Sequence, residues 1–200
     1  MPFTSMTNGK LFIISGPAGV GKSTVCKNLL ASTGDKTLCR VITMTTRKPR
    51  HNEVHAEDYH FVSEQYFEDC IRKNKLLEYA TVYEKARYGT PKEFVIESLL
   101  KGINLLLVID VQGMIGIKKN ILPELLPNVV TIFILPASLA TVVDRLTHRN
   151  SESLDELHRR IKSAEDEIKM AREYDYNILS GNELEDLLSL KKIYELETCV

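Results

Sequence analysis

Apolar runs of strand length alternate along this chain with amphipathic segments of helix length. The runs LFIIS (11–15), LLLVI (105–109) and VVTIFIL (129–135) are almost uniformly apolar, and a segment of helix length follows each of them. Strands that are apolar on both faces are typical of a parallel sheet covered by helices. The pattern therefore predicts an α/β fold, with ligands expected at the loops that follow the strands.

Two other stretches break this rhythm. Residues 43–90 mix aromatic, arginine and acidic residues around one short helix pattern at 63–75, which predicts a lobe inserted into a core of 9–42 and 91–200. Further on, Ser153 and Glu156 form a capping-box signature ahead of apolar residues at steps of three and four up to residue 171. We expect one domain over 1–200, with a helix from 154 and a short lid at about 147–160.

Composition narrows the class of protein. The 200 residues carry a formal net charge of −1, which supplies no general attraction for nucleic acid or an anionic membrane. The four cysteines form no CxxC pair, and no basic segment precedes a leader-like apolar run. We expect reduced thiols, no membrane anchor and a cytoplasmic location.

The loop after the first apolar run has the spacing of a phosphate loop. GPAGVGKST, residues 16–24, matches G-x-x-x-x-G-K-[ST], with a strand expected before it and a helix after it. Its glycines let backbone N–H groups converge on an oxyanion, and the helix N-terminus adds partial positive charge. Lys22 is expected to reach the terminal phosphates and Ser23 to offer its hydroxyl to Mg²⁺. This loop predicts binding of a nucleoside triphosphate.

A second anion site is indicated in the inserted lobe, where Arg47, Arg50 and Tyr59 lie within thirteen residues of one another. Guanidinium groups bind phosphate oxygens in a bidentate manner, and a phenol adds a directional donor without charge. Two solvated surface arginines are the alternative interpretation.

From about Gly9 to about Tyr194 the chain resembles guanylate kinases, which belong to the P-loop nucleoside monophosphate kinases. The resemblance rests on the order and spacing of several motifs: SGPAGVGKST, TTRKPR with EDYHFVS, LLEYA, YGTP, IDVQG, IFILPAS with DRLTHR, RRIKSAEDEI and YDYNIL. It implies a P-loop parallel sheet flanked by helices, with an inserted monophosphate-binding lobe and a short lid.

The resemblance also implies a binding site for GMP. Arg47, Arg50, Tyr59 and Tyr88 would hold its phosphate, and Glu78 would read the base with help from Thr43, Thr90 and Asp110. A carboxylate can accept both N1–H and N2–H₂ of guanine, whereas adenine presents an acceptor at N1. A strand-end acid that caps the following turn is the alternative for Asp110.

For the donor, the resemblance implies ATP on the phosphate loop and arginines of the lid over its phosphates. The loop residues expected to bind ATP are Gly16, Pro17, Ala18, Gly19, Val20, Gly21, Lys22, Ser23 and Thr24, with Arg145 beside them. Lys22, Arg47, Arg149 and Arg160 would be catalytic, and Ser23 and Asp110 would serve Mg²⁺. For Arg160, an exposed ion pair with Glu156 four residues earlier is the alternative.

Several residues depart from the family pattern or imitate other sites. Val108 replaces an acid, Asn150 replaces a glycine at the start of the lid, and the segment before Tyr88 carries an apparent one-residue insertion. His51 and His55 lie four apart, but Pro49 favours a loop and the glutamate is misplaced for H-E-x-x-H. Tyr174 and Tyr176 are expected to pack beside a final strand.

The sequence therefore predicts a kinase that transfers the γ-phosphoryl group of Mg·ATP to GMP, with dGMP as a further acceptor. Its partners would be these small molecules, without nucleic acid or membrane, and the chain would be a monomer or weak homo-oligomer. Two other functions remain open: phosphorylation of a sugar phosphate such as ribose 1,5-bisphosphate, and phosphopeptide binding without catalysis. The presence of Lys22 and Ser23 disfavours the latter.

Overall fold

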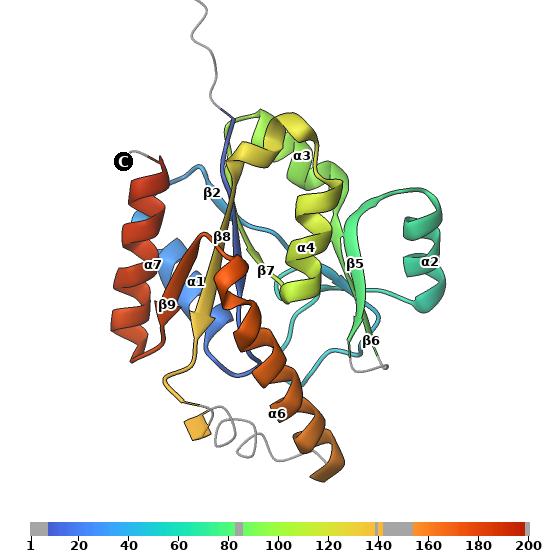
Figure 1. Ribbon diagram of the computed structural model, residues 1–200. Helices are drawn as coiled ribbons and strands as arrows, with labels where there is room; N and C mark the ends of the chain where they lie inside the picture. Colours follow the sequence, from blue (N-terminus) through green and yellow to red (C-terminus); the bar gives the residue numbers. More distant parts are fainter. Residues whose placement is uncertain (1–7, 83–85, 139, 142–153, 199–200) are drawn as a thin grey trace, which may run out of the picture. The chain divides into compact units, whose positions relative to one another are not determined.

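The computed structural model describes residues 8–82, 86–138, 140–141 and 154–198 (Figure 1). The chain divides into two compact units. The first unit contains Met1–Leu11, Thr37–Leu107 and Gln112–Val129, and the second contains Phe12–Lys36, Val108–Val111 and Val130–Val200.

A five-stranded sheet has the order β2 (Leu38–Arg40), β7 (Asn104–Val108), β1 (Leu11–Ser15), β8 (Val129–Leu135) and β9 (Tyr176–Leu179). β2 and β7 are parallel, as are β8 and β9, with Cys39 opposite Leu105 and Phe133 opposite Asn177. All of β1 is buried, as are the first six residues of β8. The predicted α/β fold is thus confirmed, because its apolar runs form strands of a parallel sheet.

The first unit contains a second, four-stranded sheet. Its order is β4 (His60–Phe61), β3 (Met44–Thr45), β6 (Ala86–Pro91) and β5 (Leu76–Val82). Helix α2 (Glu64–Arg72) begins where the Ser63 hydroxyl accepts a hydrogen bond from the backbone N–H of Tyr66 at 3.2 Å. Its buried Phe67 and Cys70 pack against Leu76 of β5, so this sheet and helix share a small core.

Other helices of the first unit follow β6 and β7. They are α3 (Lys92–Leu100), α4 (Val111–Asn120) and the 3₁₀ helix η1 (Pro123–Asn128); Val111 alone of α4 belongs to the second unit. The Asn120 side chain donates to the carbonyl of Leu77 at 3.0 Å. This bond fixes the end of α4 to β5.

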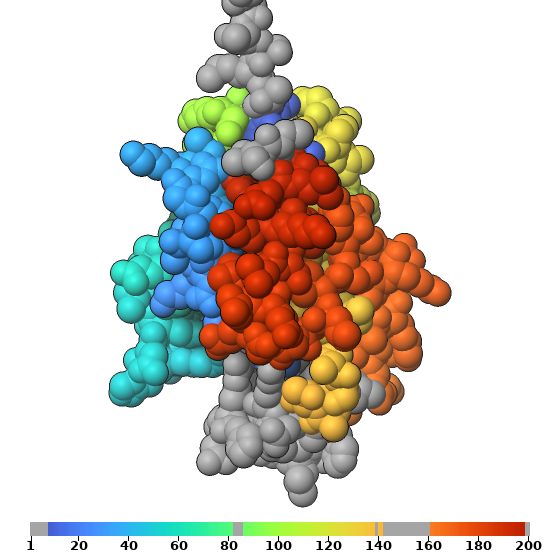
Figure 2. Space-filling model, turned by 90° about the vertical axis from the view of Figure 1, so that its left-hand side faces the viewer, coloured from blue at the N-terminus to red at the C-terminus, as the bar shows by residue number. Residues whose placement is uncertain are grey.

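In the second unit, helix α7 (Glu183–Thr198) packs on α1 (Lys22–Thr33). The ring of Tyr194 contacts Phe12 at 5.2 Å between centroids, and its hydroxyl donates to Asp35. Figure 2 looks onto the outer side of α7, drawn in red, which exposes Leu184, Leu188 and Leu196. The inner side of the helix carries the buried Leu190 and Tyr194.

The helix predicted from residue 154 is confirmed as α6 (Leu154–Lys169), and the 3₁₀ helix η2 (Met170–Glu173) follows it. Its expected cap, Ser153, lies outside the described residues. Tyr174 packs against Phe133 of β8 at 5.1 Å, and Tyr176 lies within the final strand β9 and donates its hydroxyl to Glu197 at 2.6 Å. The expectation that both tyrosines pack beside the final strand is therefore corrected for Tyr176, which is part of that strand. Within the described part of the chain, every helix is too short or too polar to cross a membrane.

Candidate nucleotide-binding sites

The phosphate loop requires glycine at its first position. Gly16 follows β1 with a φ of 145°, and a Cβ at this residue would lie 2.5 Å from the carbonyl oxygen of Ile134. Both the conformation and the lack of space exclude a side chain. Gly21 caps α1 with a φ of 105°, in open space. The loop thus turns sharply out of β1 and leads directly into the N-terminus of α1.

The N-terminus of α1 carries the partial positive charge of a helix end, and no acidic side chain of α1 neutralises it. No acidic residue lies in the first turn of α1, and Ser23 and Thr24 are exposed there. The ammonium of Lys22 donates to the carbonyl oxygens of Gly16 at 2.6 Å and Pro17 at 3.0 Å. A phosphate on the loop would offer Lys22 a charged acceptor in place of these neutral carbonyls.

A hollow of about 320 Å³ lies beside the phosphate loop in the second unit. It is lined by Gly19, Gly21 and Thr24 of the phosphate loop and α1, and by residues 181–183 with Asp186. The buried carboxylate of Asp186 accepts from the Ser180 hydroxyl and from the backbone N–H of Gly181, both at 2.9 Å. Asp186 therefore fixes the loop that follows β9. The sequence alone does not show that residues 180–186 lie beside the phosphate loop, because the pairing of β9 with β8 brings them there.

Glu167 of α6 is a further acidic group of the second unit, and it was not among the site residues predicted from the sequence. The pKa of Glu167 is raised, chiefly by burial. The negative charge of Asp110 adds to this rise, and the positive charge of Lys22 opposes it. The hydroxyl of Ser163 donates to Glu167 at 3.1 Å. The sequence held one signal for Glu167. It lies seven residues after Arg160 and three after the buried Ala164, which places it on the inward face of the helix.

In the first unit, the predicted phosphate-binding Arg47 lies among aromatic rings. Its guanidinium stands over the ring of Tyr59 at 5.4 Å and over that of Phe61 at 5.7 Å, and its Nε donates to the hydroxyl of Tyr88 at 3.2 Å. The rings of Tyr59 and Tyr88 meet edge to face at 5.8 Å. Burial raises the pKa of Tyr59, so its hydroxyl stays protonated and able to donate. The structure thus brings three of the predicted residues together.

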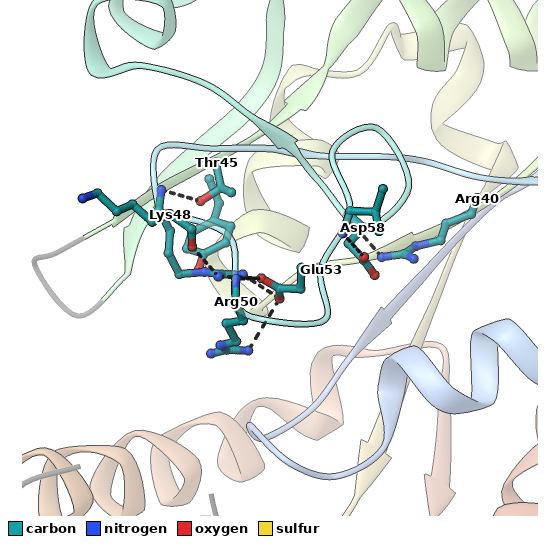
Figure 3. A network of polar contacts seen from close by, with 9 residues as sticks. Arg40, Thr45, Lys48, Arg50, Glu53 and Asp58 are labelled. Atoms are coloured by element: carbon teal, nitrogen blue, oxygen red, sulfur yellow. Dashed lines mark hydrogen bonds and ion pairs between the residues drawn. The ribbon is translucent and has the colours of Figure 1, made fainter. Parts of the chain in front are cut away.

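Glu53 joins the two predicted arginines (Figure 3). Its carboxylate accepts from Arg47 Nη1 at 2.7 Å and Nη2 at 2.9 Å, and from the backbone N–H of Arg50 at 2.7 Å. The Arg50 guanidinium lies 3.8 Å from the same carboxylate, and the Arg50 side chain is 62% exposed. Hydrogen bonding to Glu53 raises the pKa of Arg47, which therefore stays charged. Glu53 was not among the site residues predicted from the sequence, although it lies only three residues after Arg50.

The rest of this loop is held by Arg40 of β2. Its guanidinium donates to the carbonyl oxygen of Asp58 at 3.2 Å, while the Asp58 side chain accepts from the backbone N–H of Val54 at 2.8 Å (Figure 3). Ala56 adopts a φ of 66° in the same turn. The loop between Glu53 and Tyr59 is therefore fixed by contacts along its length.

The predicted base reader Glu78 lies in β5 opposite Thr90 of β6, and both are buried. The hydroxyl of Thr90 donates to Glu78 Oε1 at 2.5 Å. Thr43 is also buried, and its carbonyl accepts from the backbone N–H of His60 at 2.9 Å. Gly116 of α4 allows a close approach, since a Cβ there would lie 2.8 Å from that of Glu78. Asp110, predicted to help Glu78, follows β7 in the second unit.

Part of the predicted lid lies outside the residues that the structure describes. Arg145 and Arg149 lie outside the described residues, and Arg160 is placed in α6 by its backbone alone. The expected contacts of all three stay predictions.

The pair of histidines at 51 and 55 shows no sign of a metal site. The His51 ring lies 2.7 Å from the Asn52 side-chain oxygen. Across the described residues, no three His, Cys, Asp or Glu side chains are grouped to hold a metal ion.

Comparison with known proteins assigns the family. The family model described as guanylate kinase matches residues 8–196. Guanylate kinases from Clostridioides difficile and Rickettsia prowazekii are 41% and 42% identical to this chain. The first alignment covers 92% of this chain and 89% of its relative, and the second covers 94% and 90%. The crystal structure of guanylate kinase from Anaplasma phagocytophilum matches with a TM-score of 0.75 at 29% identity, over 96% of this chain and 89% of that one. This chain belongs to the guanylate kinase family.

Proposed function

We propose that this chain transfers the γ-phosphoryl group of ATP to GMP, giving ADP and GDP, and that dGMP is also an acceptor. The observation that carries the proposal is the buried Glu78–Thr90 pair in the same unit as the Arg47–Arg50 loop. One unit of the chain thus offers groups for a guanine base and for a phosphate. The cell compartment would be the cytoplasm, and the chain would act as a monomer or weak homo-oligomer.

Glu78 would select guanine over adenine. Its oxygens would accept from N1–H and N2–H₂ of guanine, with Thr90 holding Oε1 in place at 2.5 Å. Adenine would bring the lone pair of N1 against the same carboxylate, which is poorly screened by water because Glu78 is only 6% exposed. Leaving such a buried acceptor without donors is costly, so discrimination should be strong.

The acceptor phosphate would be held by Arg47, Arg50, Tyr59 and Tyr88. Because the attacking atom is an oxygen of an ionised phosphate, the transfer needs no general base. The requirements are alignment and compensation of negative charge. Arg47 and Arg50 supply charge, and the two phenols supply direction.

The donor phosphates would lie on residues 16–24, where Lys22 and the N–H groups at the start of α1 would bind them. Arg149 and Arg160 would bind the transferred group, and Arg145 would lie beside the adenine. Mg²⁺ fits the hydroxyl of Ser23 and the carboxylate of Asp110, because both are hard oxygen donors. When bound, it would neutralise charge on the donor phosphates.

The test is release of ADP from Mg·ATP with GMP, dGMP, AMP, UMP, CMP and ribose 1,5-bisphosphate. Turnover is expected with GMP and dGMP alone. Glu78→Gln should lower kcat/KM for GMP on the order of 100-fold, because the amide nitrogen would face the guanine donors. Glu64→Gln, a change at an exposed acid of α2, is the matched control.

Two results would contradict the proposal. Turnover with ribose 1,5-bisphosphate in place of GMP would assign the chain to sugar phosphates. Binding of GMP without release of ADP with any acceptor would make it a binding module.

A further inference from the structure

Contacts within the loop take up most of the hydrogen-bonding capacity of Arg47, and Glu53 takes the largest share. A guanidinium has five N–H donors. The contacts of Arg47 within the described residues use four of them: Nε to Tyr88, one Nη1–H to the carbonyl of Lys48, and one donor of each Nη to Glu53. The side chains of Arg47 and Glu53 are only 18% and 16% exposed. The guanidinium is therefore held in one orientation, with one donor left for a ligand.

The same carboxylate also sets the backbone at Arg50. It accepts from the Arg50 N–H at 2.7 Å, while the backbone N–H of Glu53 donates to the carbonyl oxygen of Arg50 at 3.1 Å. These two bonds close a turn from Arg50 to Glu53 (Figure 3). The exposed guanidinium of Arg50 extends from this turn. Glu53 thus determines where both arginines present their charge.

The charges of the cluster favour a phosphate even with Glu53 ionised. Arg47 and Arg50 carry one positive charge each and Glu53 one negative charge, which leaves a net charge of about +1 for a dianion to meet. Partial burial would raise the pKa of Glu53, but its bonds to Arg47 and Arg50 outweigh burial and lower it. The carboxylate therefore stays ionised at neutral pH and keeps its hold on both residues.

We infer that Glu53 is a positioning residue of the acceptor-phosphate site, which orients Arg47 and the Arg50 turn before GMP binds. This inference rests on the proposed function, since it assumes that these arginines bind the phosphate of GMP. An ordered site loses less conformational entropy on binding than two freely rotating arginines would. The contribution of Glu53 should therefore appear in GMP binding and leave ATP binding unaffected.

The experiment compares wild type with Glu53→Gln and with Glu57→Gln. Glu57 is an exposed acid of the same loop, and only its backbone carbonyl takes part in the contacts with Arg40. Glu53→Gln should raise the KM for GMP about tenfold, because it replaces a bidentate ion pair with one neutral acceptor. The KM for ATP should stay unchanged, and Glu57→Gln should match wild type in both constants.

Binding measurements separate a phosphate effect from a damaged lobe. Calorimetry with GMP and an NMR titration with guanosine, which has no phosphate, should show weaker GMP binding by Glu53→Gln and unchanged guanosine binding. Equal losses for both ligands would overturn the inference, because they would indicate a general structural role. An unchanged or lower KM for GMP would also overturn it, the lower value showing that Glu53 competes with the phosphate.

Failure of the proposed function has a different signature. If wild type binds GMP and releases no ADP, the kinase proposal fails, while the calorimetric comparison still decides the role of Glu53. If wild type does not bind GMP, both fail together.

Discussion

The residues of the acceptor site differ in how well their roles can be predicted from the sequence. Arg47, Arg50 and Tyr59 are evident because two guanidiniums and a phenol in a short polar stretch are typical of an anion site. Glu53 is not, because a glutamate in a loop is ordinarily solvated, and only the structure shows its bidentate bond to Arg47. Spacing along a loop does not determine which side chains meet, since loop backbones have no fixed period.

The Arg47–Glu53 pair should make stability depend on pH. The pKa of Glu53 is lowered in the folded state, so its ionised form stabilises the fold above the ordinary glutamate pKa of about 4.3. That contribution is lost as pH falls through the lower folded value. Wild type should therefore exceed Glu53→Gln in free energy of unfolding at pH 7, and the difference should shrink below about pH 4.3.

Urea unfolding of both proteins between pH 7 and pH 3 measures this difference. Glu57→Gln should follow wild type throughout, because Arg40 contacts only the backbone carbonyl of this exposed residue and the substitution leaves that carbonyl in place. A gap between wild type and Glu53→Gln that stays constant with pH would contradict an ionic origin.

Among the elements, the long apolar strands were predictable and the short polar ones were not. β1 and β8 have the predicted limits, and β7 begins one residue earlier than its apolar run, at Asn104. β3 and β4 have two residues each, which is too short to show a period. They exist because their neighbours supply hydrogen-bond partners, as Met44 finds opposite Gly89 and His60. These pairings depend on strands that are distant in sequence, so the local pattern of β3 and β4 could not predict them.

The close approach of α4 to β5 yields a prediction at the scale of elements. Alanine is favoured over glycine inside a helix by about 1 kcal/mol, so Gly116→Ala would ordinarily stabilise α4. Here the added Cβ would lie 2.8 Å from that of Glu78, so α4 or Glu78 must shift. We expect the KM for GMP to rise several-fold while the KM for ATP stays unchanged.

Steady-state kinetics with each substrate varied in turn checks this effect. Ile115→Ala, at an exposed neighbouring position of α4, is the control and should leave both constants near wild type. A Gly116→Ala protein with unchanged KM for GMP would show that the contact between α4 and Glu78 does not position the base reader.

At the scale of the whole molecule, both candidate sites were predictable in part because their motifs are local. Residues 16–24 are contiguous, and the acceptor arginines lie in one loop. The hollow beside the phosphate loop was not predictable, because Asp186 and Gly181 are more than 150 residues away in sequence. The limits of the two units were also hidden, since each is assembled from three separate segments.

The division into units predicts where each substrate slows hydrogen exchange. GMP should protect residues 43–62 and 76–90 of the first unit, and a non-hydrolysable ATP analogue with Mg²⁺ should protect residues 16–24 and 180–186 of the second. A ligand at 100 times its Kd stabilises the form that binds it by about 2.7 kcal/mol, so amides that exchange by opening the site should slow about 100-fold. Glu78→Gln should abolish the GMP effect and keep that of the analogue, while Lys22→Ala should do the reverse. Protection of residues 16–24 by GMP alone, with residues 43–62 unchanged, would contradict the assignment of the acceptor to the first unit.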